Sequence, residues 1–134
     1  MVTSERPVLG RSLTPEQIAS IRLAVAQWMR RARAVAAARD ELRGLDVPAD
    51  EIFRRRRAES ADAHLAALLR LAVTLVITRG ALDDSDRRRY APFLNDDVVR
   101  DVVQHVADAR RYVLQIERIA DKAALDVELD VGDY

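Results

Sequence analysis

Four consecutive arginines, Arg54–Arg57, are the residues of this sequence best suited to bind an anion. A guanidinium group donates paired hydrogen bonds to phosphate or carboxylate oxygens, so such a run can hold the phosphates of a nucleic acid. If the flanking segments form a helical hairpin with its turn near residues 44–48, Arg39 and Arg43 lie close to the run and add to it. The alternative is a solvated face on which acidic neighbours pair with the arginines.

Further features bear on a nucleic-acid role. Arg30, Arg31 and Arg33 would act with the Arg54–Arg57 run if the helix ends that carry them lie near each other. The chain has only one Trp, three Tyr and two Phe, so we expect no aromatic platform on which bases could stack. The net charge of zero gives no support to nucleic-acid binding by the domain as a whole.

Arg100 and His105 are separated by four residues, in the sequence Arg-Asp-Val-Val-Gln-His. This spacing resembles the Arg-x4-His motif of HEPN-domain ribonucleases, and the polar Asp101 directly after the arginine also fits. The resemblance implies an all-helical, often dimeric ribonuclease or toxin, in which Arg100 and His105 converge on RNA at a dimer cleft. Arg57 and His64 form a second match, with six residues between them.

The same pair also has a purely structural interpretation. Five residues on one helix correspond to about 140° of rotation, so Arg100 would face solvent while His105 flanks the apolar side. His105 would then pair with Asp101 or Asp108, four and three residues away. Because this interpretation accounts for both side chains, we expect a protein that is not an enzyme.

Few residues are suited to metal or cofactor chemistry. The absence of Cys and the presence of only two His exclude a Cys-based zinc or iron–sulfur site and a multi-His site. The acidic clusters at 83–86 and 95–97 fall where helices are predicted to begin, and helix capping explains them. We therefore expect no metal and no cofactor.

Residues 126–134 alternate acidic and apolar side chains. A period of two is typical of a strand, and such a segment could add to an exposed sheet edge of a partner protein. Leu129, Val131 and Tyr134 would be its apolar anchors. The alternative is a disordered acidic tail.

The rest of the pattern is helical. A capping Thr14 opens a first long helix, Pro15–Arg43, whose apolar seam at three–four spacing includes Trp28. A second long helix is predicted from residue 46 to residue 79, and it is apolar on nearly all sides over residues 65–77.

A short helix near Ser85–Tyr90 and a third long helix, from a cap at Asn95 to about Leu125, follow. Short loops favour antiparallel neighbours. We therefore expect an all-α fold, an elongated antiparallel helical bundle with three long helices and a short connecting helix. Its parts are a flexible N-terminal arm at 1–12, a helical bundle domain at 13–125 and an acidic tail at 126–134.

Composition limits the class of protein. The chain has 134 residues, which is typical of one domain. It shows no secretory leader and no apolar run that could span a membrane, so we expect a cytoplasmic protein without a membrane partner. Lys122 is the only lysine beside 21 arginines, which is typical of codon usage in a GC-rich bacterial genome.

Two features favour self-association. The apolar surface of residues 65–77 exceeds what two neighbouring helices cover, so we expect a dimer. The charge is also uneven, since residues 1–60 carry 12 basic and 8 acidic side chains and residues 101–134 carry 4 and 8. The main hypothesis is therefore a helical interaction or assembly protein, a homo-oligomer that also binds a protein partner. The alternatives are an arginine-rich subunit that contacts nucleic acid in a nucleoprotein complex, and an HEPN-like ribonuclease.

Overall fold

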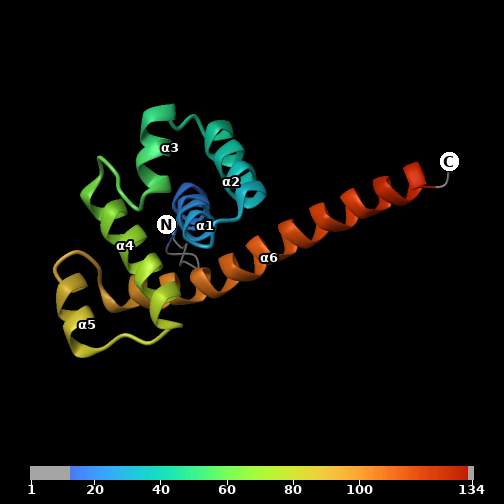
Figure 1. Cartoon of the computed structure of the whole chain (residues 1–134). Helices are drawn as coiled ribbons and strands as arrows, with labels where there is room; N and C mark the ends of the chain where they lie inside the picture. The colour runs from blue at the N-terminus through green and yellow to red at the C-terminus, as the bar shows by residue number, and fades with distance from the viewer. Residues whose placement is uncertain (1–12, 133–134) are drawn as a thin grey trace, which may run out of the picture.

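The computed structural model describes the backbone of residues 13–132 and the side chains of residues 13–119 and of Lys122. This part of the chain forms six helices and no strand, which confirms the predicted all-α fold class. The predicted arm at 1–12 lies outside it. The helices are α1 (Pro15–Trp28), α2 (Ala32–Gly44), α3 (Ala49–Arg56), α4 (Ala63–Thr78), α5 (Asp84–Tyr90) and α6 (Asp96–Gly132), as Figure 1 shows.

Helix α1 is the central element, and α2, α3, α4 and α6 all pack against it (Figure 1). It begins as the sequence predicts: the Thr14 hydroxyl accepts a hydrogen bond from the N–H of Gln17, and the Gln17 side chain accepts one from the N–H of Thr14. Between Ala19 and Ala26, every residue except Arg22 is buried. A helix that is buried on nearly all sides requires neighbours on nearly all sides.

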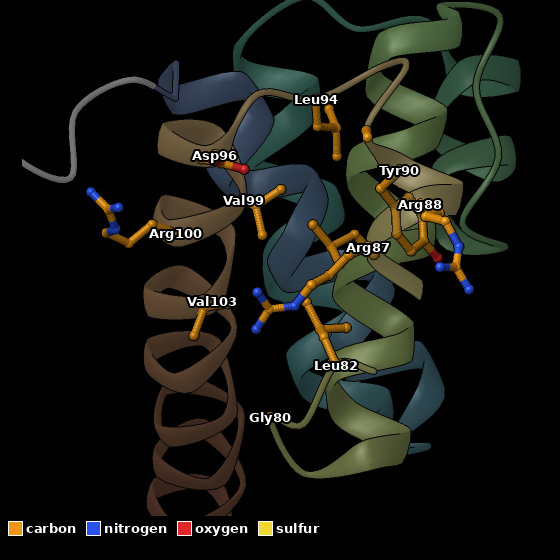
Figure 2. A pocket seen from close by; sticks show the side chains of 12 residues that line it. Gly80, Leu82, Arg87, Arg88, Tyr90, Leu94, Asp96, Val99, Arg100 and Val103 are labelled. Atoms are coloured by element: carbon orange, nitrogen blue, oxygen red, sulfur yellow. The ribbon is translucent and has the colours of Figure 1, made fainter. Parts of the chain in front are cut away.

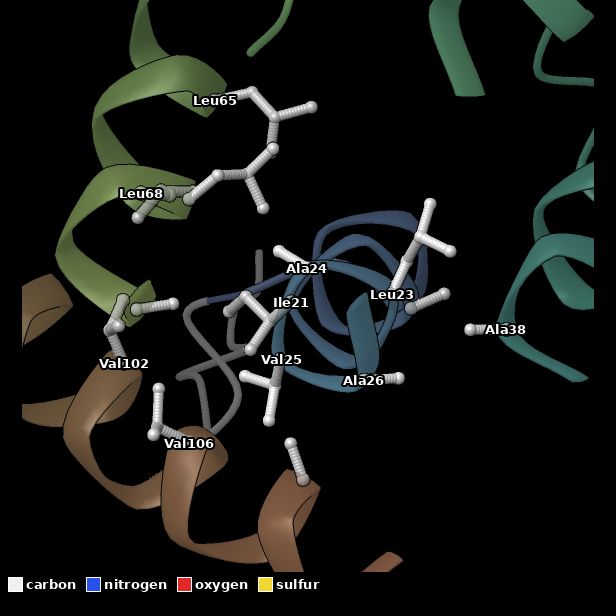
Figure 3. Close-up of a cluster of buried hydrophobic side chains, with 14 of the residues drawn as sticks. Ile21, Leu23, Ala24, Val25, Ala26, Ala38, Leu65, Leu68, Val102 and Val106 are labelled. Carbon is white, nitrogen blue, oxygen red and sulfur yellow. The ribbon is translucent and has the colours of Figure 1, made fainter. Parts of the chain in front are cut away.

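Small and branched side chains alternate around α1 and determine how close its neighbours lie. Figure 3 shows Val25 directed toward Val106 of α6, and Leu23 directed toward Ala38 of α2. Leu23, Val25 and Ala38 are completely buried. The alanine-rich composition therefore contributes to packing in this core, because an alanine lets a neighbouring helix approach closely.

The prediction of one helix over Pro15–Arg43 was wrong, because the chain turns sharply at residues 29–31. Arg30 has a positive φ of 57°, and the N–H of Arg31 donates a 3.0 Å hydrogen bond to the carbonyl oxygen of Ala26. A left-handed residue other than glycine costs about 1 kcal/mol. Packing of α2 back against α1 offsets this cost. The buried residues of α2 are Ala34, Val35, Ala38 and Leu42.

A second turn divides the predicted helix over residues 46–79 into α3 and α4. Ala58 has a positive φ of 58°, and the side chain of Asp62 caps α4 by accepting from the N–H groups of His64 and Leu65. Because of this turn, α3 and α4 each reach α1 separately. The prediction of three long helices in an elongated bundle was therefore wrong, since the described helices cluster around α1 instead.

The apolar surface of α4 is covered mostly within one chain. The segment that joins α4 to α6 folds back over it: Tyr90 and Leu94 are buried, and the Tyr90 hydroxyl lies 3.0 Å from Oγ1 of Thr74. Ile77, near the end of α4, is the large apolar side chain of this helix that stays exposed, at 56%. This coverage removes the main reason for expecting a dimer, and self-association stays a prediction.

Helix α6 has the predicted apolar seam and is longer than predicted. It continues to Gly132 and extends beyond the other helices (Figure 1). The prediction of a strand was therefore wrong for residues 126–132, which are helical. A lone strand leaves its backbone N–H and C=O groups without partners, whereas a helix pairs them internally. The buried seam residues are Val102, Val106, Ala109 and Val113.

Candidate anion-binding groove

Three adjoining hollows lie where the end of α1, the start of α2 and the end of α3 meet. Their volumes are about 520, 540 and 220 Å³, and Arg56 lines all three. We call them together the arginine groove, because six arginines line them and no described lining residue is acidic. These arginines are Arg30, Arg31, Arg39, Arg43, Arg56 and Arg57.

The turns that break the predicted long helices also build the groove. The turn at residues 29–31 places Arg30 and Arg31 at its wall, and the end of α3 brings Arg56 and Arg57 to the same place. Arg56 is held there by α1, because its Nε donates a 2.8 Å hydrogen bond to Oε1 of Gln27. Positive charge from the turn after α1, from α2 and from the end of α3 is thereby gathered on one surface.

Little negative charge opposes these arginines. Arg39 and Arg43 each lie 3.7 Å from Oδ1 of Asp40, which is longer than a hydrogen bond. The Nε of Arg39 is buried and has no hydrogen-bond partner among the described residues. Arg30 and Arg31 make no side-chain hydrogen bond or ion pair with any described residue. An anion in the groove would therefore meet two arginines without a described partner, Arg30 and Arg31, beside four that already have one.

Two large aromatic side chains accompany the arginines. Trp28 is 52% exposed and lines the hollow that also contains Arg30 and Arg57. Phe53 is 57% exposed and lines the hollow that contains Arg43. The expectation that Trp28 lies on the apolar seam of a long helix was wrong. Helix α1 ends at Trp28, so the seam stops there and the side chain stays exposed.

Comparison with protein-family models, with curated proteins and with solved structures found no match to this chain. What the groove could bind is therefore inferred from the residues that line it.

The structure separates the four members of the Arg54–Arg57 run. Arg56 and Arg57 line the groove, while Arg54 is turned toward the acidic side chains Asp50 and Glu51, at 3.5 and 3.3 Å. Arg55 is buried, with only 6% of its surface exposed. The side chains of a run of four on a short helix point in different directions, so only part of the run can serve one site.

Arg55 belongs to a buried polar cluster that joins α1 to α3. Its Nε donates to Oε2 of Glu51 at 2.7 Å, and its Nη1 lies 2.8 Å from Oε2 of Glu16. The same nitrogen donates to the hydroxyl of Ser20, which is completely buried in α1. This arginine therefore acts in folding rather than in ligand binding.

Glu51 is the acidic centre of that cluster. Burial alone would raise the pKa of its carboxyl. Hydrogen bonds from the Ser60 hydroxyl, from Arg55 and from the N–H of Ala61, together with the charge of Arg55, outweigh burial and lower the pKa from 4.5 to about 2. The carboxylate thus stays ionised and continues to hold Arg55 away from the groove.

Arg33 does not join the groove. It lies at the start of α2, where its NH1 is 3.7 Å from Oε2 of Glu117 in α6. The other carboxylate oxygen of Glu117 accepts hydrogen bonds from the backbone N–H groups of Arg33 and Ala34. Because no side chain of α2 itself caps this helix, Glu117 supplies the cap from a distant part of the chain.

The structure does not bring Arg100 and His105 to a common site. Both lie on α6, where Arg100 is exposed and 3.5 Å from Asp97, and His105 is half-buried. Arg100 borders a pocket of about 550 Å³ between α4, α5 and α6, and His105 is not among the residues that line it. Figure 2 shows the guanidinium of Arg100 pointing away from α5, while Arg87 reaches in between the helices. Asp101 and His105 each have an interaction partner in the fold.

The second candidate pair, Arg57 and His64, is divided by the turn between α3 and α4. Arg57 directly follows α3 and His64 lies in the first turn of α4, so the two do not share a helix face. Among the candidate anchors of the tail, Leu129 and Val131 lie in α6 by their backbone. Their side chains, and Tyr134 as a whole, fall outside the described part of the chain.

The described part of the chain contains neither a metal-binding cluster nor a helix that could span a membrane. There, no group of three or more His, Asp or Glu side chains is arranged to hold a metal ion. None of the helices there has both the length and the apolar character needed to cross a membrane.

Proposed function

We propose that the protein is a non-enzymatic accessory protein that binds nucleic acid through the arginine groove. The observation that supports this most is the charge of the groove: six arginines line one connected surface, and no described lining residue is acidic. Contacts with phosphates release condensed counterions, and this release supplies most of the affinity of non-specific nucleic-acid binders. The groove has the composition that such binding needs.

The state of individual donors supports the same proposal. The buried Nε of Arg39 lacks an acceptor among the described residues. The rest of the Arg39 side chain is partly exposed, at 37%, so its outer nitrogens are the donors that a phosphate oxygen could reach. Arg56 is already held in place by Gln27, so less side-chain freedom is lost when it binds.

The zero net charge of the chain is compatible with this function, because basic residues outnumber acidic ones in the part of the chain that forms the groove. Residues 101–134 carry 8 acidic and 4 basic side chains, while residues 1–60 carry 8 acidic and 12 basic ones. A phosphate within about 10 Å of the groove therefore responds to the local excess of arginine rather than to the total.

The proposal is tested by measuring the affinity of the full-length protein for a fluorescent 20-nucleotide DNA by anisotropy, at 50 and 200 mM salt. We expect binding that weakens by at least tenfold between the two conditions. Arg31→Glu should weaken binding further, because it places an acid in the groove. Arg110→Glu, on the exposed surface of α6, is the matched control and should change little. Absence of binding at 50 mM salt would exclude the proposal.

Association through α6 is a second candidate function. Leu114 and Ile119 of α6 are 42% and 58% exposed. A second copy that covers these side chains would make the protein a dimer. Sedimentation equilibrium should then give twice the monomer mass, and Ile119→Glu should give the monomer mass. A monomer at all concentrations of the unaltered protein would exclude this candidate.

A further inference from the structure

The arginine groove presents aromatic surface that phosphate binding alone does not require. Trp28 and Phe53 are each more than half exposed, at 52% and 57%. Trp28 lines one hollow and Phe53 lines another, and Arg56 lines both of these hollows. An exposed indole and an exposed phenyl ring beside guanidinium groups offer flat faces next to positive charge.

We propose that the groove selects single-stranded nucleic acid and stacks bases on Trp28 and Phe53, an inference that rests on the proposed nucleic-acid function. In a duplex the faces of the bases are covered by their neighbours, whereas a single strand can turn them outward. Grooves that track the backbone with cations and stack bases on aromatic rings bind single strands without sequence preference. The residues of the groove supply both parts.

The lining of the hollows indicates which kind of contact each one could make. Trp28 shares its hollow with Arg30 and Arg57, and Phe53 shares its hollow with Arg43. The third hollow, which Arg31 lines, has arginines but no aromatic residue. A strand in the groove would therefore stack bases in the hollows that contain Trp28 and Phe53, and would place phosphates near Arg56, which lines all three hollows and is held by Gln27.

Phe53 is further prepared for stacking by Arg57. The guanidinium carbon of Arg57 lies 5.8 Å from the centre of the Phe53 ring, at a spacing of four residues across the end of α3. A planar guanidinium over an aromatic ring stabilises both side chains in one orientation. A base that stacks there joins an existing pair, so its own loss of freedom is the main entropic cost.

Trp28 provides a direct readout, because it is the only tryptophan of the chain. The full-length protein is titrated with a thymidine 20-mer, and separately with a 20-base-pair duplex, while indole fluorescence and anisotropy are recorded. We expect quenching of Trp28 by the single strand and little change with the duplex. The affinity for the single strand should exceed that for the duplex by about tenfold at equal salt.

Two variants separate stacking from charge. Trp28→Leu should weaken single-strand binding by about tenfold and leave both duplex binding and the salt dependence unchanged. Phe93→Leu is the matched control, because Phe93 is 54% exposed but lies outside the groove, and it should change neither affinity. The inference would be overturned by equal affinity for the two forms, by absence of quenching, or by an unchanged affinity of Trp28→Leu. Salt-dependent binding in the same experiments would still support the proposed function of the groove. Failure to bind either form would overturn both proposals.

Discussion

The Nε of Arg56 donates a 2.8 Å hydrogen bond to Oε1 of Gln27, which ties the last residue of α3 to the last turn of α1. Arg56 is also the residue shared by all three hollows of the arginine groove. The hydrogen bond that links α3 to α1 is thus made by the same side chain that lines every hollow of the proposed binding surface. Its partner Gln27 lines two of the same hollows.

Loss of the Gln27 acceptor should weaken binding more than it weakens the fold. In Gln27→Leu, Arg56 keeps its charge but loses the contact that orients it, so we expect about fivefold lower affinity for a single-stranded 20-mer, equivalent to about 1 kcal/mol. Anisotropy titration measures this, and urea unfolding checks the fold. Gln115→Leu, an exposed glutamine of α6, is the control and should match the unaltered protein. Equal loss in both variants would contradict the role of Gln27.

The buried cluster around Glu51 should contribute strongly to stability. Glu51→Gln keeps the shape of the side chain but leaves Arg55 with Glu16 as its remaining acidic partner. Removal of one partner of a buried ion pair costs about 3–5 kcal/mol, and the second carboxylate should bring the loss to about 3 kcal/mol. Urea unfolding gives the value. Glu59→Gln, an exposed site nearby, should lose less than about 0.5 kcal/mol.

The pH dependence of stability follows from the low pKa of Glu51. Its folded-state pKa of about 2 lies below the ordinary 4.5, so its contribution is complete above pH 4.5 and is lost as the pH falls toward 2. The shift corresponds to about 3 kcal/mol. Urea unfolding of the unaltered protein and of Glu51→Gln at pH 6 and pH 2.5 should therefore give a difference that shrinks at the lower pH. A difference that is the same at both values would show that Glu51 is not the group responsible.

Glu117 should hold α2 and α6 together, since it accepts from the N–H groups of Arg33 and Ala34. Glu117→Ala removes a cap that no residue of α2 replaces, and we expect a loss of about 1–2 kcal/mol in the free energy of unfolding. Thermal unfolding followed by circular dichroism measures it. Gln115→Ala, also on α6, serves as the control. A stability equal to that of the unaltered protein would mean that solvent caps α2 equally well.

Much of the helical content was predictable because its signals are local. Thr14 and Gln17 are three residues apart, and the valines of α6 recur at three–four spacing, so both can be recognised in the sequence. The breaks at Arg30 and Ala58 were not predictable in this way. Neither site has Gly or Pro, and the left-handed conformation there is imposed by the packing of several helices around α1.

The groove was predictable only in part, for the same reason. The run at Arg54–Arg57 drew attention to α3, and Arg39 and Arg43 were expected near it, whereas Arg30, Arg31 and Arg33 were expected there only if the helix ends lay near each other. Sequence alone did not show that Arg55 turns inward. The signals that could have indicated this are Glu51 four residues before it and the polar Ser20 within the buried stretch of α1. The exposure of Trp28 was not predicted, because the sequence analysis placed it on the apolar seam of one long helix, Pro15–Arg43, and α1 ends at Trp28.

The salt dependence of binding in charge-matched variants tests the central claim most directly. The logarithm of the association constant for a single-stranded 20-mer is measured against the logarithm of salt concentration for Arg31→Gln/Arg57→Gln and for Arg110→Gln/Arg118→Gln, two exposed arginines of α6. Each phosphate contact contributes about 0.7 to the slope, so the groove variant should have a slope shallower by about 1.4, and the α6 variant should keep the slope of the unaltered protein. Equal slopes in all three proteins would contradict the claim that the arginine groove is where nucleic acid binds.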